Sequence, residues 1–407
     1  MLTKQDISVL RELAQKYAEY AALPVHEKKR GLWIQNNEGR AARPMVLIDQ
    51  ICWGEINADG NMNEQVQDDY WRRVEGWLRR TLYCWEHIPV DMVLTPYVQI
   101  PMPLIDSGWG VTIKEDVLAE DKNAGGYSHH YYDVMETEEQ LAAVRLPEFT
   151  MDCEALRRIR EEADVIFEGI IPYRLRGDSL HLGVWDKISF WRGVENCYID
   201  LMDRPEFMHA IMEKLTQGLI SQIESLNKLE AYDVVSGLTH CSHNFLSHQS
   251  PDDKAVTANG WGMGLAQLFS SVSPEVTREF EVEYMKRVFP YFGAIYYGCC
   301  ERLDDRLDVL SALPKVKKIS CSPWSHKDAF AEKLPSGIVM SAKPNPAFLA
   351  TNAFDEEAVR KDLRETIEAA KRHNRNLEFI LKDISTIRYD QKRLWRWAEI
   401  AMEEAER

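Results

Sequence analysis

Short apolar runs recur along the chain, and segments with helical spacing of apolar residues separate most of them. Eight such runs can be placed, and each is short enough to be a strand buried on both faces. Eight strands that alternate with helices predict an α/β fold of the (β/α)8 barrel type. The repetition is architectural, because the sequence itself shows no repeat. The predicted strands are residues 44–51, 91–98, 165–170, 232–238, 294–297, 316–319, 337–341 and 377–381.

A doubly wound parallel sheet is the structural alternative. It would need a glycine-rich phosphate-binding turn after the first strand, and Cys52-Trp53-Gly54-Glu55 is not such a turn. We therefore expect a helical extension over residues 1–43 and a single distorted barrel over residues 44–407, with long loops at its mouth. Residues 99–150 interrupt the pattern as an insertion, which is either a functional lid or binding segment or a surface β-hairpin.

Composition and charge disfavour several classes of function. The chain has 407 residues and a net charge of −16, which disfavours a nucleic-acid partner because phosphate binding needs clustered Lys and Arg. The N-terminus lacks a long apolar run, and no stretch approaches about 18 uninterrupted apolar residues, so we expect neither a secretory signal nor a membrane span. The eight cysteines are scattered, which fits reduced thiols in a cytoplasmic protein better than a disulfide framework.

The densest group of reactive side chains lies in residues 293–324. Cys299, Cys300 and Glu301 follow directly after the fifth predicted strand, and the carboxyl ends of barrel strands hold the active sites of such folds. For a single cysteine here, a role as a small buried hydrophobic residue is the alternative. Zinc takes Cys, His and carboxylate ligands, so His240, Cys299 and Glu301 form a candidate metal set. Cys299 and Glu301 are two residues apart, which puts both on one side of an extended chain.

Other residues at predicted strand ends and in the loops extend the candidate site. Glu301 and Asp383 are candidates for acid–base catalysis, with a structural salt bridge as the alternative for each. The chain has 12 tryptophans, and flat apolar side chains suit the wall of a small-molecule pocket. The residues that we expect to contact the substrate are Trp53, Trp109, Tyr131, Trp261, Gln267, Lys343 and Asn345.

Four phrases in the second half of the chain carry a family resemblance. They are WRGVENCYIDLMDRPEFMHAIMEKL at 191–215, GLAQLFSSVSPEVTREF at 264–280, YYGCCERL at 296–303 and SAKPNPAFL at 341–349. In their order and separation, these phrases resemble the uroporphyrinogen decarboxylase superfamily. Within it, the chain looks more similar to the methyltransferases that serve corrinoid proteins than to the decarboxylase itself. The resemblance implies a distorted (β/α)8 barrel with its active site at the mouth.

Two departures from the family patterns bear on function. True decarboxylases carry an N-terminal arginine motif of the type RQAGR that holds the tetrapyrrole, and the corresponding stretch here, RAARPMVLIDQICWGE, lacks it. The family's methyltransferases bind zinc through His-x-Cys and a late cysteine, where this chain has Tyr297-Gly298-Cys299 and Lys382-Asp383. Cys299 therefore matches a ligand position of the family. The remaining ligands of a zinc ion would have to come from Cys300, Glu301, His240 or Asp383.

The leading hypothesis is a methyltransferase that moves a methyl group from a small methylated donor, for example a methoxylated aromatic compound, to a corrinoid. We expect a separate partner protein to carry the corrinoid, and a homodimer is compatible with the sequence. Zinc with oxygen ligands, or an acid at Glu301 or Asp383, would polarise the leaving group. A metal-independent decarboxylase that holds its substrate through Lys343 or an arginine is the second hypothesis. A non-catalytic ligand-binding barrel is the third, because fold alone does not fix function.

Overall fold

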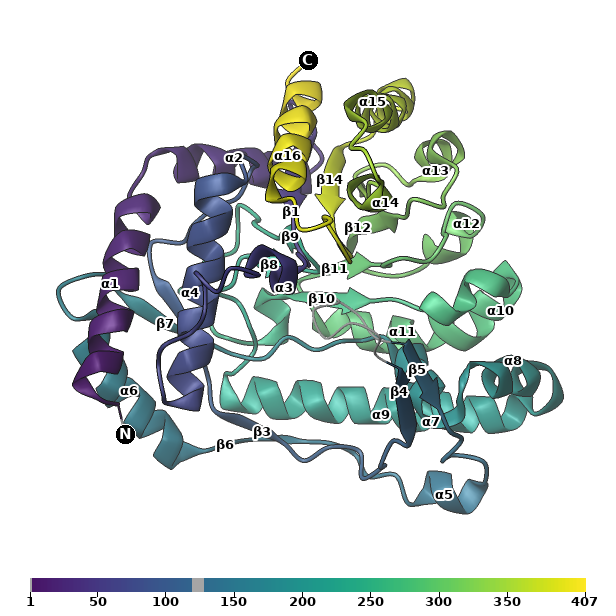
Figure 1. Cartoon of the computed structure of the whole chain (residues 1–407). Coiled ribbons are helices and arrows are strands. Elements are labelled where there is room, and N and C mark those ends of the chain that lie inside the picture. The colour runs from purple at the N-terminus through teal and green to yellow at the C-terminus, as the bar shows by residue number, and fades with distance from the viewer. Residues whose placement is uncertain (1, 119–127) are drawn as a thin grey trace.

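A six-stranded parallel sheet forms the centre of the molecule (Figure 1). The structure is a computed structural model that describes residues 2–118 and 128–407. The strands of the sheet are adjacent in the order β1 (Met45–Ile48), β14 (Leu377–Leu381), β13 (Val339–Ala342), β12 (Val316–Cys321), β11 (Ala294–Tyr297) and β10 (Trp261–Gly264). Every neighbouring pair is parallel, as an α/β fold requires. The sheet confirms the strands predicted at residues 44–51, 294–297, 316–319, 337–341 and 377–381.

The strands predicted at residues 91–98 and 165–170 are wrong. Pro96 has no N–H group for a ladder, and the chain becomes a strand only at β2 (Val98–Pro101). Residues 165–167 still belong to helix α6 (Cys153–Phe167), because Ile166 and Phe167 continue its buried stripe. The strand that follows this helix is β7 (Tyr173–Arg176).

The strand predicted at residues 232–238 is also wrong. The Asp233 carboxylate accepts the N–H groups of Val235 and Ser236 at 3.0 and 2.9 Å. Such a local side-chain hydrogen bond turns the backbone and competes with a strand ladder. Strand structure resumes only at β8 (Leu238–Thr239).

β10 lies where the sequence predicted a loop-rich segment, in residues 244–272. Its two glycines, Gly262 and Gly264, weaken the strand signal in the sequence. Close packing requires a glycine here, because a Cβ atom at Gly264 would lie 2.5 Å from Cζ of Phe289. Gly264 thus weakens the strand signal in the sequence and also permits the close packing of β10.

The strand ladder does not close into a ring in the described part of the chain, contrary to the expected eight-stranded barrel. β2 and β7 form a separate parallel pair. Isolated contacts join this pair to the large sheet, such as the Asp91 N–H that donates to the Val46 carbonyl at 2.9 Å and the Leu182 N–H that donates to the Met263 carbonyl at 3.0 Å. We call the six-stranded sheet the arc. The seam is the irregular side of the fold, made of residues 88–102, 173–182 and 232–239.

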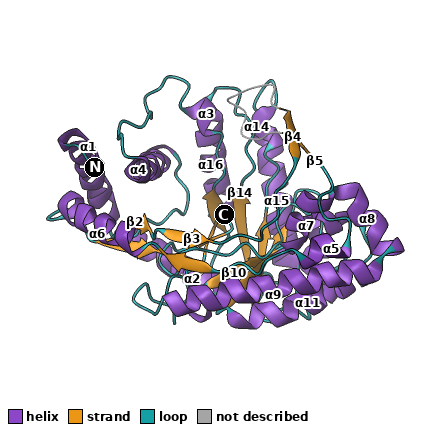
Figure 2. Ribbon diagram, turned by 90° about the horizontal axis from the view of Figure 1, so that it is seen from below, coloured by secondary structure: helices purple, strands orange, loops and turns teal. Residues whose placement is uncertain are grey.

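Helices surround the arc and the seam (Figures 1 and 2). Their apolar faces follow the helical period, as in α15, where Val359, Leu363 and Ile367 are buried. None of the described helices is both long and apolar enough to cross a bilayer. The longer helices are α1 (Lys4–Ala21), α2 (Val25–Asn37), α4 (Asp69–His87), α6, α7 (Val184–Arg192), α8 (Val194–Asp203), α9 (Pro205–Leu229), α11 (Glu283–Val288), α13 (Lys327–Lys333), α15 (Glu356–Arg372) and α16 (Gln391–Ala405). The short ones are α3 (Trp53–Ile56), α5 (Glu138–Ala142), α10 (Pro274–Thr277), α12 (Leu307–Leu310) and α14 (Ala347–Ala350).

The predicted insertion at residues 99–150 contains short antiparallel pairs. β3 (Leu104–Asp106) pairs with β6 (Phe149–Met151), and β4 (Glu115–Leu118) pairs with β5 (Ser128–Tyr131). Its residues 119–127 lie outside the described residues. A third small pair, β8 with β9 (Ser242–His243), lies at the seam.

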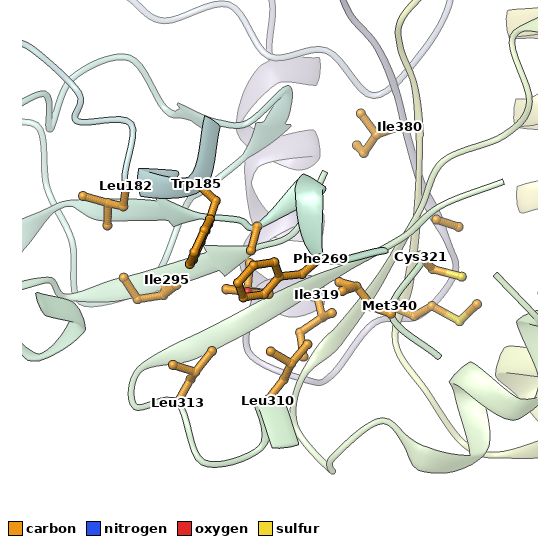
Figure 3. Packing of buried hydrophobic residues seen from close by; sticks show 14 of the residues in the cluster. Leu182, Trp185, Phe269, Ile295, Leu310, Leu313, Ile319, Cys321, Met340 and Ile380 are labelled. Atoms are coloured by element: carbon orange, nitrogen blue, oxygen red, sulfur yellow. The ribbon is translucent and has the colours of Figure 1, made fainter. Parts of the chain in front are cut away.

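The two faces of the arc differ in polarity. Strand register places Tyr297, Ile319 and Met340 in one row that faces the helices. There they join a core that includes Trp185 and Phe269, whose rings are 4.4 Å apart (Figure 3). Each fully buried large side chain of this kind stabilises the fold by roughly 1.5–3 kcal/mol. The opposite, concave face carries polar side chains and leads to the candidate site.

Candidate functional site

Two adjacent cysteines and a Lys-Asp pair meet at the carboxyl ends of β11 and β14. Cys299 Sγ lies 3.3 Å from Cys300 Sγ, and Lys382 Nζ lies 3.4 Å from each sulfur. Oδ2 of Asp383 lies 2.6 Å from Lys382 Nζ and 3.1 Å from Cys300 Sγ. We call these four residues the thiol–lysine cluster.

The curvature of the arc brings the cluster together. β12 and β13 separate β11 from β14 in the strand order, so side chains at the ends of β11 and β14 can touch only across the concave face. The local backbone contributes, because Gly298 has a φ of 89° and a Cβ atom there would lie 2.6 Å from Cδ1 of Leu303. The Ser320 hydroxyl then fixes the loop by donating to the Cys299 carbonyl at 2.6 Å.

Electrostatics distinguishes the two thiols of the cluster. The hydrogen bond with Cys300 lowers the pKa of Cys299, burial opposes this shift, and the Lys382 ammonium adds to it. Contact with Cys299, together with burial, raises the pKa of Cys300. Burial opposes the charge on Lys382, but the Cys299 thiolate and the Asp383 carboxylate raise the pKa of this lysine. Cys299 is therefore the more acidic thiol of the pair.

Glu301 and His240 have partners other than the cluster. The buried Glu301 carboxylate accepts the Cys299 N–H at 2.8 Å and the Ala266 N–H at 3.4 Å, and burial raises its pKa. Glu301 thus braces the loop that holds Cys299. The His240 ring packs against the Tyr296 ring with the centroids 5.0 Å apart, and burial lowers the pKa of His240 to about 2.

These contacts allow a test of the proposed zinc site. Each oxygen of Glu301 accepts a backbone N–H group, and His240 packs against an aromatic ring. No group of three His, Cys, Asp or Glu side chains among the described residues could hold a metal ion. The candidate ligands His240, Cys299 and Glu301 therefore do not fit a zinc ion in this arrangement.

A buried polar chain crosses the concave face of the arc. Lys343 Nζ donates to Tyr296 Oη at 2.5 Å and to Ser341 Oγ at 3.0 Å. Ser341 Oγ donates to one oxygen of Glu378 at 2.7 Å, and Lys318 Nζ donates to the other at 2.7 Å. Burial lowers the pKa of Lys343 to about 8. The Lys343 amine, which we expected to contact substrate, is thus engaged by side chains of the barrel interior.

A cavity of about 570 Å³ lies between the seam, β1 and α4. Its wall includes Asp49, directly after β1, and Trp53, at the start of α3. The Asp49 N–H donates to the Leu381 carbonyl at 2.9 Å, and Lys382 follows Leu381 in the chain. The cavity therefore lies at the carboxyl end of β1, the strand next to the one that leads into Lys382, and none of the four cluster residues lines it.

Of the residues expected to contact substrate, Trp53 lines this cavity and the others do not. Trp109 is buried against Trp191, with ring centroids 6.0 Å apart. Trp261 begins β10 and so lies at the amino end of that strand, away from the mouth. The Tyr131 ring stacks on the His129 ring with the centroids 5.6 Å apart.

The two remaining predicted residues lie after strands but are engaged locally. Gln267 follows β10, and its Nε2 lies 3.5 Å from Oδ2 of Asp186. Asn345 follows β13, and its Oδ1 accepts the Ala347 N–H at 2.9 Å. The second contact fixes the start of a short helix, which is an ordinary structural role for asparagine.

The sequence analysis missed most of the polar groups at the cavity. Lys382 could have been found, because it follows a buried strand directly and adjoins Asp383, which was selected. Asp178 and Asp233 line the cavity, but they lie on the seam, where no strand pattern marks a strand end. Their neighbour Arg176 also lines the cavity and ends β7, a strand that the sequence did not predict.

One solved structure is similar to this chain over nearly its whole length. It is a methyltransferase from Methanosarcina mazei, with a TM-score of 0.51 and 9% sequence identity, and the match covers 92% of this chain and 98% of that one. At this identity the likeness shows that the two chains share a fold. No family model matches the sequence, and no curated protein matches it.

Proposed function

We propose that this protein is a methyltransferase that binds a small methylated donor in the cavity and passes its methyl group to a corrinoid on a separate protein. The observation that carries the proposal is the position of the cavity at the carboxyl end of β1, which pairs with β14, the strand that leads into Lys382 and Asp383. A ligand site at the carboxyl ends of the strands is where this class of fold performs chemistry. The similar structure from Methanosarcina mazei is a methyltransferase, which supports the same reaction class.

The chain's own residues then have separate tasks. The cavity orients the donor through Trp53 and the polar groups of the seam. The thiol–lysine cluster combines the Cys299 thiol, whose pKa is lowered, with the Lys382–Asp383 ion pair. When bound by its partner protein, the corrinoid supplies the nucleophile that accepts the methyl group.

The decarboxylase alternative receives less support from the geometry. It needs a cationic side chain that is available to a substrate carboxylate. Lys343, expected in that role unless an arginine takes it, is buried and already bonded to Tyr296 and Ser341. Arg176 lines the cavity, so this alternative depends on that arginine. Lys382 is buried and bonded to Asp383.

Methyl exchange tests the proposal directly. Purified protein is mixed with methylcobalamin, as a stand-in for the partner's methylated corrinoid, and with a panel of amines, phenols and thiols. We expect acceptor-dependent loss of the methyl group, followed by the visible spectrum of the cobalamin. Trp53→Ala should reduce the rate at least ten-fold, whereas Trp324→Ala, on an exposed loop, should not. No exchange with any acceptor, by the free cobalamin or by a purified corrinoid protein, would refute the proposal.

A further inference from the structure

The cavity combines aromatic walls with carboxylates. Tyr17, Trp53 and Trp77 supply aromatic surface. Three carboxylates line the same space: Asp49, Asp178 and Asp233. Aromatic faces carry negative electrostatic potential and attract cations, most strongly where water is excluded. Both kinds of group therefore favour a positively charged ligand.

The carboxylates of the cavity make no direct ion pair. Asp49, Asp178 and Asp233 have no Lys, Arg or His partner within ion-pair distance among the described residues. Two arginines, Arg80 and Arg176, also line the cavity, and Arg80 lies 3.7 Å from Glu64. Burial raises the pKa of Asp178 and of Asp233, and the charge of Arg176 opposes this shift without cancelling it.

Two further polar side chains in the wall have unused hydrogen-bonding capacity. Thr81 and Gln99 are each 9% exposed and line the cavity. Gln99 Nε2 donates to the Ser236 carbonyl at 3.3 Å, which leaves the amide oxygen free to accept. For the Thr81 hydroxyl no hydrogen-bond partner exists among the described residues. Both side chains can therefore offer a hydrogen bond to a polar ligand in the cavity.

We propose that the ligand of this cavity is a methylated ammonium cation, which is the methyl donor of the reaction; this inference rests on the proposed methyl transfer. Trp53 and Trp77 contact the methyl groups and Asp178 and Asp233 balance the charge. In the transfer, the bond between nitrogen and one methyl carbon breaks and its electron pair stays on nitrogen. The methyl carbon bonds to the reduced corrinoid nucleophile. A quaternary donor then leaves as a neutral amine, and no proton has to move.

This chemistry distinguishes the ammonium donor from the methoxylated aromatic donor suggested by the sequence. An aryl methyl ether leaves as a phenolate, so negative charge would develop next to the carboxylates of the cavity. Repulsion between neighbouring like charges is strong in a partly buried site. An ammonium donor loses its positive charge instead, so its product is released from the carboxylates that held it.

A matched pair of ligands tests the charge requirement without any partner protein. Choline and its neutral isostere 3,3-dimethylbutan-1-ol have nearly the same shape, and calorimetry measures the binding of each. We expect choline to bind at least ten-fold more tightly. Equal affinity for the two, or binding of 4-methoxybenzoate without binding of choline, overturns the inference.

Paired variants locate the site. Asp178→Asn with Asp233→Asn should weaken choline binding at least ten-fold, and Trp53→Leu should weaken it by a smaller factor. Asp252→Asn removes an exposed carboxylate that pairs with Arg174 outside the cavity, and it should leave binding unchanged. Circular dichroism of each variant verifies folding. Unchanged affinity in the folded Asp178→Asn, Asp233→Asn double variant contradicts the assignment of the site.

The two proposals fail in different ways. If choline binds in the cavity but no acceptor of any class exchanges methyl groups with the corrinoid, the binding of an ammonium cation stands and methyl transfer is refuted. If methyl exchange occurs only with phenols, methyl transfer stands and the ammonium inference is refuted. Exchange with dimethylamine or trimethylamine as acceptor, blocked by the Asp178→Asn, Asp233→Asn double variant, supports both.

Discussion

The arc and the seam have different roles in the molecule. The arc holds its strands in an uninterrupted parallel ladder, and its ends position the thiol–lysine cluster to within hydrogen-bonding distance. The seam has the short β2–β7 pair and otherwise isolated strand contacts, and it lines one side of the cavity of about 570 Å³. A closed ladder along the seam would take up the backbone groups and space that now form the cavity wall. The regular strand ladder of the arc thus positions the reactive groups, and the irregular seam leaves room for a ligand.

This difference implies different sensitivities to mutation. A change in the arc should lower the stability of the whole fold, because its buried polar chain spans four strands, β11 to β14. A change in the seam should alter ligand binding with little loss of stability, as is typical of binding segments on a rigid scaffold.

The largest expected effect concerns the ion pair inside the arc. Lys318 and Glu378 are both fully buried, and Lys318 Nζ lies 2.7 Å from the Glu378 carboxylate. Lys318→Met leaves Glu378 as an uncompensated buried charge, which should lower the free energy of unfolding by about 4 kcal/mol. Urea denaturation followed by tryptophan fluorescence measures this change. A double variant, Lys318→Met with Glu378→Gln, should recover part of the loss, and equal losses in the single and double variants would contradict the pairing.

The second prediction separates two tryptophans that the sequence placed in one substrate wall. Trp109 is buried against Trp191, whereas Trp53 lines the cavity. Trp109→Ala should cost about 3 kcal/mol of stability and leave the affinity for choline unchanged in the folded protein. Trp53→Ala should instead weaken the binding of choline and have little effect on stability. Thermal melts measure the stability of the two variants, and calorimetry measures their affinity for choline. A loss of affinity in Trp109→Ala would show that the core and the cavity are coupled.

The success of the sequence analysis follows the same division between the arc and the seam. Strands such as β11 and β14 are buried on both faces, so their apolar runs were visible and their ends marked Cys299 and Asp383 correctly as neighbours at one mouth. Along the seam, Pro96 and the turn at Asp233 break the strand pattern, and the polar residues of the cavity wall therefore had no predicted strand end to mark them. Pairwise contacts such as that of Glu301 with the Cys299 N–H depend on loop geometry, which spacing alone does not give.

A third prediction concerns the thiolate at the cluster. Cys300 and Lys382 lower the pKa of Cys299, in that order of size. Cys300→Ala should therefore raise the pH at which Cys299 becomes reactive, and Lys382→Met should raise it by less. Alkylation by iodoacetamide over a range of pH, with each cysteine read by mass spectrometry, gives the midpoint. The exposed Cys153 serves as an internal reference, and a Cys299 midpoint that is the same in all three proteins would show that the cluster does not stabilise the thiolate.

The smallest expected effect is on the stability of the ligand-free seam. Burial raises the pKa of Asp178 and of Asp233 above the values of an unfolded chain. Their protonated forms are thus favoured by folding, and this contribution is complete below a pH of about 3.8 and is lost as the pH rises through the folded-state pKa values. At pH 7 the Asp178→Asn, Asp233→Asn double variant should therefore unfold at a slightly higher temperature than the wild type. The gain should disappear at acidic pH, and choline should stabilise only the wild type. A double variant that is less stable than the wild type at pH 7 would mean that the carboxylates serve the fold rather than the ligand.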